Sequence, residues 1–330
     1  MKPLGLGFKI FLLLLFTIFV SLLSLSLGSV NISLADTFSA LIGGKVDALT
    51  SQILFQIRLP RILLALAVGG GLSVAGAVFQ SILMNPLAEP YILGISSGGT
   101  FGAVLSFLLG LSFWATQIFA FAGAAVVVFL VFVLSKRYGE LEPNVLLLTG
   151  IMIGAFFAAA TLFMLTMLQE NLKNAVFWLM GNLTLASADS VVYVLPITII
   201  VSLFLVFNGQ KYNVLSLGDE SARHLGINTS FLKNMTYVLT SIMIGAIVSV
   251  SGIVGFVGLL IPHLCRLIFG FDNRIIIPVS FFVGASYLII ADTIARILIA
   301  PAEFPVGTIT ALVGAPIFIY LMKKRSTAVS

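Results

Sequence analysis

The chain has 330 residues, of which 60% are hydrophobic and only 9% are charged. Soluble domains are about 45–50% apolar and about 25% charged, so the polar residues here are too few to enclose a water-soluble core. The net charge of +5 is spread in twos and threes between apolar runs, which is typical of membrane-protein loops rather than of a nucleic-acid-binding patch. The single cysteine, Cys265, excludes an internal disulfide framework.

Ten apolar segments are predicted to span a membrane, because a helix needs about 20 apolar residues to cross the hydrocarbon. The first lacks an A-x-A-like cleavage site and is longer than the apolar part of a secretory signal, so we expect it to be retained. The eighth is short and contains Pro262 and three glycines, which favours a bent or re-entrant form lining a cavity. A single transmembrane domain over residues 1–330 is expected, with spans near residues 9–29, 61–83, 91–109, 113–135, 144–168, 189–208, 232–252, 254–270, 275–297 and 307–322.

The distribution of lysine and arginine predicts that both termini are cytoplasmic, because inner loops carry the excess of these residues. The twelve inner residues are Lys2, Lys9, Lys136, Arg137, Lys211, Arg223, Lys233, Arg266, Arg274, Lys323, Lys324 and Arg325. The five outer residues are Lys45, Arg58, Arg61, Lys173 and Arg296.

A short sequence pattern occurs twice. Ser73-Val-Ala-Gly-Ala-Val78 is similar to Ser249-Val-Ser-Gly-Ile-Val254, and a proline follows each copy eight residues later, at Pro86 and Pro262. The copies lie on spans that run in opposite directions, and inverted repeats are typical of transporters. A chance match in a chain rich in Gly, Val and Ser is the alternative.

Two outer arginines precede the second span in Arg58-Leu-Pro60-Arg61. Proline suits the first turn of a helix, so the span is expected to start here with both arginines on one face. Cations are disfavoured at a helix N-terminus and on the outer side. A partner bearing carboxylates would explain them, with Arg296 as a third member, whereas contact with lipid phosphates is the alternative.

The longest inner polar stretch, Asn208–Ser230, is predicted to hold a short amphipathic helix. Ser216-Leu-Gly-Asp219 fits a capping box, and Gly226 fits a helix stop. Such a helix could contact a soluble partner that moves the spans, or it could be a plain surface helix. The loop Met84-Asn-Pro-Leu-Ala-Glu-Pro90 cannot continue either flanking helix, which fits a rigid turn beside a conduction path or an ordinary tight connection.

Two other functional classes have weak support. Gly94-Ile-Ser96-Ser-Gly98 matches the G-x-S-x-G of serine hydrolases, with His263 as a candidate base, but both flanks are predicted helices rather than the required strand and helix. His263 and Cys265 are too few for a metal site. An ion-coupled carrier usually keeps an ionisable residue at mid-membrane, whereas Asp292 is near an outer end and Glu303 is in a loop. The sequence has no G-x-x-x-x-G-K-[ST] loop, so ATP binding by this chain is not expected.

Four ordered blocks resemble the FecCD-type permeases of vitamin B12, haem and iron–siderophore ABC importers. The blocks are RLPRILLALAVGGGLSVAGAVFQSILMNPLAEPYILGISSGG from Arg58, SLGDESARHLGIN from Ser216, GIVGFVGLLIPHLCRLIFG from Gly252, and ADTIAR…AEFPVGTITALVGAPIFIYLMKK from Ala291. The resemblance covers nearly the whole chain. It implies an all-α type II ABC importer permease in the bacterial inner membrane, with ten helices and an inverted repeat.

The resemblance also implies partners and site residues. A homodimer with a pathway on its twofold axis is expected to bind two ATPases, which hold the ATP and Mg, and an outer substrate-binding protein; no cofactor or metal is expected in this chain. Docking of the binding protein is expected at Arg58, Arg61 and Arg296, and coupling to the ATPase at Ser216, Gly218, Asp219, Glu220, Arg223 and Gly226. The inner gate and pathway are expected at Asn85, Leu87, Ser96 and Ser97. Before the fifth span, some family members carry small hydroxyl residues in a second gate element where this chain reads Glu142-Pro-Asn144, so that role is not carried over.

The sequence leaves the cargo open. Ferric siderophore is the first expectation because most family members carry one, and cobalamin and haem are the alternatives. An ion-coupled secondary transporter is the competing class.

Overall fold

A computed structural model describes residues 5–137, 140–184, 186–300 and 302–327, so Lys2 lies outside the described residues. The described chain is helical apart from one two-stranded hairpin, β1 (Lys136–Arg137) and β2 (Glu140–Leu141). The long helices are α1 (Leu6–Ser26), α4 (Leu59–Ile82), α6 (Phe113–Leu134), α7 (Pro143–Met167), α9 (Ala188–Phe207), α12 (Thr229–Ser251), α14 (Asn273–Ile297) and α15 (Val306–Thr327). The shorter ones are α2 (Leu34–Leu41), α3 (Ala48–Gln52), α5 (Ile95–Leu108), α8 (Leu172–Leu179), α10 (Gly209–Leu215), α11 (Asp219–His224) and α13 (Val257–Phe269).

The predicted spans correspond to helices of two lengths. Among the described residues, eight helices are long and apolar enough to cross a membrane, and α5 and α13 are shorter apolar helices of 14 and 13 residues. Each short helix follows a long one through an irregular segment, residues 83–94 before α5 and residues 252–256 before α13. The bend expected in the eighth segment is therefore an irregular stretch, in which Gly252 and Phe256 have positive φ values, followed by a helix. This shared order of long helix, irregular segment and short helix agrees with an inverted repeat, although the two copies of the short sequence pattern differ in backbone: all of 73–78 is helical, whereas Gly252 has a φ of +65°.

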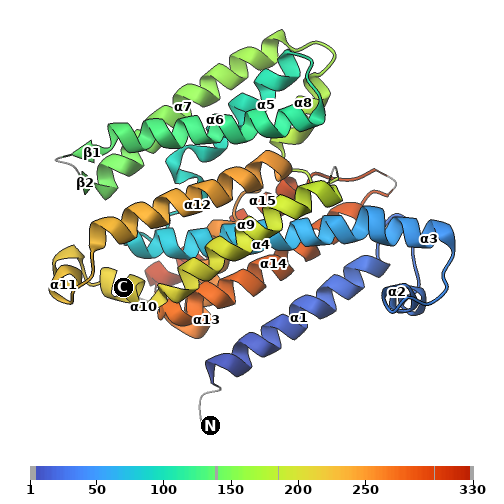
Figure 1. Ribbon diagram of the computed structural model, residues 1–330, viewed down its shortest axis with the longest axis horizontal. Coiled ribbons are helices and arrows are strands. Elements are labelled where there is room, and N and C mark those ends of the chain that lie inside the picture. Colours follow the sequence, from blue (N-terminus) through green and yellow to red (C-terminus); the bar gives the residue numbers. More distant parts are fainter. Residues whose placement is uncertain (1–4, 138–139, 185, 301, 328–330) are drawn as a thin grey trace.

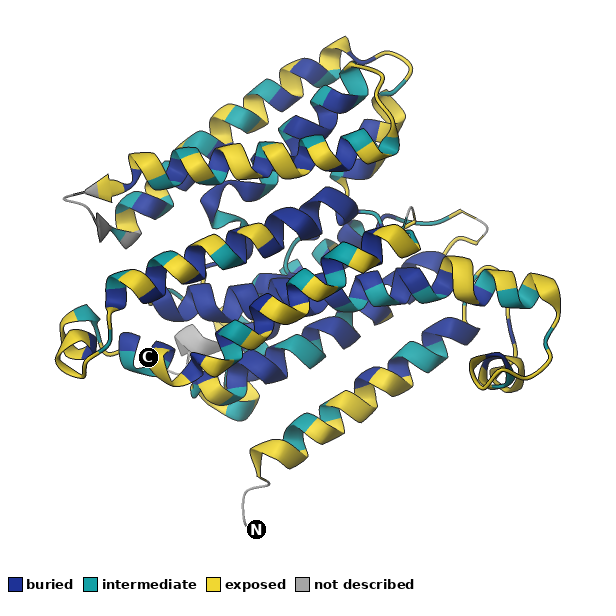
Figure 2. Ribbon diagram, viewed as in Figure 1, coloured by how far each residue is buried: buried dark blue, intermediate teal, exposed yellow. Residues whose placement is uncertain are grey.

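Burial varies strongly between helices (Figure 2). In α4 nearly every side chain is buried, and it lies at the centre of the bundle. In α1, α7 and α15 few side chains are buried, and the exposed ones include large apolar residues such as Phe19, Phe156 and Ile319. Water would penalise so much exposed apolar surface, whereas lipid does not, so the exposed faces of these helices are those of a membrane protein.

The helix containing α4 starts earlier than the sequence predicts. The candidate span runs without a break over Ala48–Ile82, through α3 and the π-helix η1 (Ile53–Arg58) into α4. Leu59 donates its N–H to the Leu54 carbonyl, five residues back, and this wider turn precedes Pro60. A π turn relieves the clash and the missing donor of a proline inside a helix. The expectation that the span begins at Pro60 is wrong, and so is the placement of Arg58 and Arg61 at a helix N-terminus.

Glycines let the central helices approach closely. A Cβ on Gly76 of α4 would overlap the carbonyl oxygen of Gly258 in α13, and one on Gly69 would overlap the carbonyl oxygen of Gly284 in α14. Pro262 in α13 has no N–H for the Gly258 carbonyl, which is therefore free to face α4. Small residues at such crossings are the usual means of packing membrane helices.

The two ends of the bundle carry different elements (Figure 1). One end, called here the α8 end, holds α2, α3 and α8. The other, the α11 end, holds α10, α11 and the β1–β2 hairpin, and the first residue of α1 and the last of α15 also lie toward it. The described parts of both chain ends are thus on one side of the bundle, as an even number of spans requires.

Candidate functional site

A buried arginine cluster lies toward the α8 end, between α4 and α14. The Arg61 guanidinium donates from Nε and Nη2 to the Asp292 carboxylate, over distances of 2.9–3.1 Å. Its Nη1 donates to Glu303 Oε2 at 2.7 Å. The Arg61 and Asp292 side chains are buried, whereas 26% of the Glu303 side chain is exposed. Two carboxylates of its own chain therefore neutralise Arg61.

The other two predicted docking arginines join the same cluster. The Arg296 Nε lies 3.3 Å from Asp292 Oδ2 without hydrogen-bond alignment, and its Nη2 donates to Ser24 Oγ at 2.7 Å. Arg58 donates instead to backbone carbonyls at the end of α1 and just beyond it, those of Leu25, Ser26 and Val30. Each arginine is only 4% exposed. Three guanidiniums thus share two carboxylates, which leaves one positive charge unmatched within the cluster.

A cavity of about 220 Å³ opens beside the cluster. Arg58, Arg61, Arg296 and Glu303 line it, together with apolar residues of η1 and residues 28–30. Glu303 also accepts a hydrogen bond from Thr184 Oγ1 at 3.2 Å. The cluster is therefore linked through Glu303 to the loop between α8 and α9.

The predicted coupling segment folds as two short helices, α10 and α11. Ser216 does not cap α11: its hydroxyl donates to the Tyr212 carbonyl at the end of α10, and Gly218, with a φ of +104°, is the N-cap. The expected capping box is thus wrong, because Ser216 and Leu217 close the preceding helix. The helix stop at Gly226 is confirmed. Its φ is +78°, and the N–H groups of Gly226 and Ile227 bond back to the carbonyls of Arg223 and Ala222.

The acidic residues of α11 differ in their surroundings. Asp219 Oδ2 lies 2.5 Å from Lys233 Nζ on α12, and the Lys233 side chain is only 8% exposed. Glu220 is almost fully exposed, and its carboxylate lies 4.0 Å from His224 Nε2 one turn further along the helix. Arg223 donates from Nε to Thr229 Oγ1 at 3.1 Å. Asp219 therefore anchors α11 to α12, while Glu220 lies on the surface.

Local hydrogen bonds hold the first half of the loop between α4 and α5. Met84 has a φ of +48°, and the Asn85 side chain accepts a hydrogen bond from the Leu87 N–H at 2.9 Å, which forms an Asx turn. The Gln80 side-chain amide, at the end of α4, reaches the Ala88 carbonyl at 3.4 Å. Met84 and Leu87 are exposed. The two predicted gate residues, Asn85 and Leu87, thus lie in one exposed turn, residues 84–87, called here the protruding turn.

The two predicted pathway serines lie in the first turn of α5. Gly94 precedes them with a φ of +74°, after the 3₁₀ helix η2 (Pro90–Leu93). No strand leads into this turn, so the arrangement lacks the strand–turn–helix of a hydrolase nucleophile. Ser97, but not Ser96, lines an open cavity of about 330 Å³ with Glu89, Tyr91 and residues 150–158 of α7. Burial raises the pKa of Glu89.

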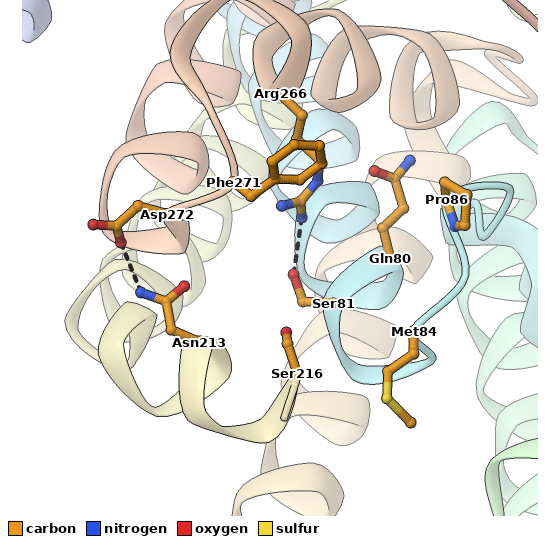
Figure 3. A pocket seen from close by; sticks show the side chains of 9 residues that line it. All are labelled: Gln80, Ser81, Met84, Pro86, Asn213, Ser216, Arg266, Phe271 and Asp272. Carbon is orange, nitrogen blue, oxygen red and sulfur yellow. Dashed lines mark hydrogen bonds between the residues drawn. The ribbon is translucent and has the colours of Figure 1, made fainter. Parts of the chain in front are cut away.

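A further cavity, of about 520 Å³, lies at the α11 end (Figure 3). It is lined by Gln80, Ser81, Met84, Pro86, Asn213, Ser216, Arg266, Phe271 and Asp272. These residues come from α4, the loop that follows it, α10, α13 and the loop before α14. The cavity therefore lies between the protruding turn and the predicted coupling segment.

Sequence reasoning missed the partners of the predicted residues. Nothing local links Arg61 to Asp292 or Glu303, which are 231 and 242 residues away. The only available signal was the rarity of buried charges in spans, which predicts that each has a partner without naming it. His263 packs against the Phe318 ring at a centroid distance of 5.7 Å. Within the described residues, no three His, Cys, Asp or Glu side chains come together to hold a metal ion.

Known proteins resemble this chain along almost its full length. Residues 14–324 match the FecCD transport family. The iron(3+)-hydroxamate import system permease protein FhuG of Bacillus subtilis is 37% identical, with 98% of each chain covered. The hemin transport system permease protein HmuU of Yersinia pestis is 37% identical over 95% of this chain and 96% of its own. A solved structure, described as an inward-facing conformation of a metal-chelate-type ABC transporter, superposes with a TM-score of 0.86 at 32% identity, covering 96% of this chain and 98% of that one.

These matches span the arginine cluster, the protruding turn and the coupling segment together. The chain has no ATP-binding loop of its own, and a separate subunit hydrolyses the ATP. The chain belongs to the FecCD transport family and is the membrane-spanning permease subunit of an ABC importer.

Proposed function

We propose that this permease carries a metal chelate, with ferric siderophore as the first candidate, into the bacterial cytoplasm as one half of a homodimer. The α8 end faces outward and the α11 end faces the cytoplasm. The similarity to permeases named for ferric hydroxamate and hemin carries the cargo proposal. The excess of lysine and arginine at the α11 end supports the orientation.

The arginine cluster is the proposed docking site for a substrate-binding protein. The supporting observation is the unmatched positive charge among Arg58, Arg61 and Arg296, beside a cavity that Glu303 partly closes. A carboxylate from the partner would supply the missing negative charge. Because the guanidiniums already lie within the bundle, the partner would insert its acidic side chain rather than meet a flat basic surface.

Coupling to the ATPase is proposed at Ser216–Gly226. The exposed face of this segment combines the Glu220 carboxylate with Leu217 and Leu225, each about two-thirds exposed. Apolar residues beside a charge are the usual make-up of a protein interface. The Asp219–Lys233 contact then passes movement of α11 to α12.

The inner gate is proposed at the turn of Asn85 and Leu87, with Ser96 and Ser97 nearer the pathway. The turn follows directly after α4, the most buried helix, so its position is tied to the centre of the bundle. The cavity beside Ser97 is lined by small residues of α7, including Gly150 and Gly154, which leaves room beside the turn.

Uptake by cells that lack this chain tests the proposal. Labelled ferric hydroxamate, hemin and cobalamin are supplied separately, with and without the restored wild-type gene. We expect one cargo, ferric hydroxamate, to lose uptake and to regain it with the gene. Loss of hemin or cobalamin uptake instead would show that the cargo is hemin or cobalamin rather than ferric hydroxamate. Unchanged uptake of all three would contradict metal-chelate import.

A proton- or sodium-coupled carrier is the competing function, and the buried Asp292 in α14 is the observation that favours it. Its carboxylate is occupied by Arg61 and Arg296, which does not leave it free to take up a cation. Vesicles containing only this chain separate the two functions, because a carrier would respond to an ion gradient without an ATPase.

A further inference from the structure

Arg266 has an incomplete set of partners inside the cavity of about 520 Å³ (Figure 3). Its Nη2 donates to the Ala77 carbonyl and to Ser81 Oγ, both at 2.8 Å, and to Asn273 Oδ1 at 3.2 Å. No described residue accepts from its Nε or Nη1, and no described carboxylate forms an ion pair with it. The guanidinium therefore has one edge bound to the bundle and the other edge available.

The remaining charges around the cavity leave this guanidinium uncompensated. Asp272 lines the same cavity, but its carboxylate accepts hydrogen bonds from Arg274 at 2.6–3.1 Å and from Asn213 at 2.7 Å. The hydrogen bonds from Arg274 lower the pKa of Asp272 to about 2, so this group is fully charged and matched by Arg274. Arg266, Arg274 and Asp272 together carry one excess positive charge.

The cavity joins two parts of the proposed mechanism. Asn213, on α10, accepts from the Asn273 N–H at 2.7 Å, and Ser81, at the end of α4, donates to Asn273 Oδ1 at 2.8 Å. Arg266 binds both Ser81 and Asn273. A continuous hydrogen-bonded path thus runs from the coupling segment through Asn273 and Arg266 to the helix that carries the protruding turn.

We propose that this cavity receives an acidic side chain of the ATPase, whose carboxylate binds the free edge of Arg266. The inference rests on the proposed function, which places the ATPase against the adjoining coupling segment. Charge complementarity identifies the occupant: a carboxylate matches the planar guanidinium edge and supplies the one missing negative charge. Asn213 and Ser216 line the same cavity.

A carboxylate at this place would act on both ends of the path. It would hold α13 through Arg266 and lie between α10 and the turn that begins at Met84. Movement of the ATPase would then reach the proposed gate directly, in addition to passing through the Asp219–Lys233 contact. The cavity is thus a second point of attachment beside α11.

Substitutions at Met84 test the charge requirement without removing any bond of Arg266. The Met84 side chain is 63% exposed and lines the cavity. Met84→Glu, Met84→Gln and Met84→Lys have similar length and differ in charge. We expect the affinity of the purified permease for its ATPase to fall in the Glu variant by roughly tenfold at low salt relative to the Gln variant, and to rise in the Lys variant. Equal affinities for all three variants would overturn the inference.

Cross-linking identifies the occupant. In Arg266→Lys the positive charge is kept, and a water-soluble carbodiimide joins a lysine amine to a carboxylate in direct contact, whereas arginine does not react. We expect the assembled complex to yield a cross-linked peptide joining position 266 to an Asp or Glu of the ATPase, and wild type to yield none at this position. A cross-link only to Asp272, or none at all in the assembled complex, would contradict the proposal.

A lipid headgroup is the competing occupant, and the permease alone distinguishes it. Retention of phosphatidylglycerol by wild type, lost in Met84→Glu when measured by native mass spectrometry, would assign the cavity to lipid and overturn the inference. Failure of the wild-type permease to assemble with any ATPase would overturn the proposed function itself. If wild type assembles with the ATPase and the three Met84 variants bind the ATPase with equal affinity, only the proposed role of the cavity is overturned.

Discussion

Asp292 is the residue on which the arginine cluster depends most, because it contacts two of the three guanidiniums. Asp292 is 1% exposed, and its carboxylate accepts hydrogen bonds from two nitrogen atoms of Arg61, Nε and Nη2. A charge in such surroundings is tolerated only with a charged partner, since desolvation would otherwise dominate. The cluster therefore stabilises the packing of α4 against α14, whatever it also binds.

Asp292→Asn is expected to destabilise the permease by about 3–5 kcal/mol, because it leaves the three buried guanidiniums with one carboxylate, that of Glu303. The thermal midpoint in detergent measures the loss. Glu170→Gln, at an exposed position in the loop before α8, is the matched control and should change the midpoint little. An unchanged midpoint for Asp292→Asn would show that the cluster contributes nothing to stability.

Glu89 is expected to make stability depend on pH. Burial raises its pKa in the folded chain, so the unfolded chain releases this proton at lower pH than the folded chain does. The contribution of Glu89 to stability is therefore greatest below its pKa in the unfolded chain. It falls as the pH rises toward its pKa in the folded chain, and it is constant above that value. Glu89→Gln should remove that fall and raise the thermal midpoint at pH 7. A lower midpoint in the variant, or an unchanged pH profile, would contradict the assignment.

Asp219 and Glu220 are neighbours with different expected effects. Asp219→Asn leaves the buried Lys233 amine without its carboxylate and should cost about 1–2 kcal/mol, discounted because the Asp219 side chain is 44% exposed. Glu220→Gln should leave the midpoint unchanged and weaken only the association with the ATPase. Measuring both properties on both variants separates the anchoring residue from the surface one. Equal effects of the two substitutions on stability would contradict the distinction.

At the scale of the helices, the crossing of α4 and α13 depends on Gly76. Gly76→Ala would drive a methyl group into the Gly258 backbone, which cannot move like a side chain, so we expect a loss of about 1–3 kcal/mol or more. Gly245→Ala, in α12, is the matched control because its Cβ would meet only ordinary contacts at 3.5–3.6 Å. The control should be neutral or slightly stabilising. Similar midpoints for the two variants would contradict the close crossing.

The positions of most helices could be predicted from the sequence, because apolar length alone defines a span. The predicted 113–135 became Phe113–Leu134, and 275–297 became Asn273–Ile297. The start of the continuous helix Ala48–Ile82 could not, since proline usually marks a helix start and the π turn that accommodates Pro60 has no sequence pattern. The capping box at Ser216 failed for a similar reason, because a serine that closes one helix has the same spacing as one that opens the next.

The candidate site was predictable in part. The residues of each block could be located through the family resemblance, but their surroundings depend on contacts between distant segments. The three arginines were expected at a surface and lie buried, because Asp292, Glu303 and the carbonyls after α1 reach them from other parts of the chain. Lys233 is likewise buried, because Asp219 reaches it from α11 across the turn that leads into α12.

At the scale of the whole molecule, the two ends of the bundle are joined by its most buried helices. Arg58 and Arg61 of the arginine cluster lie on the same continuous segment as the protruding turn, with α4 between them. Helix α12 runs from Lys233, the partner of Asp219, to the loops at the α8 end. Movement at the coupling segment can therefore reach the outer end through rigid elements. Exposed apolar faces lie on α1, α6, α7, α9 and α15, which leaves these helices to contact lipid or a second subunit.

ATP-driven uptake into reconstituted vesicles tests the central claim most directly. The permease is reconstituted with its ATPase, and labelled ferric hydroxamate is supplied with its binding protein on the side of the α8 end. We predict uptake that requires ATP, the ATPase and the binding protein together and that does not respond to a proton or sodium gradient. Uptake by the permease alone, driven by such a gradient and insensitive to loss of the ATPase, would contradict its role as an ABC importer subunit.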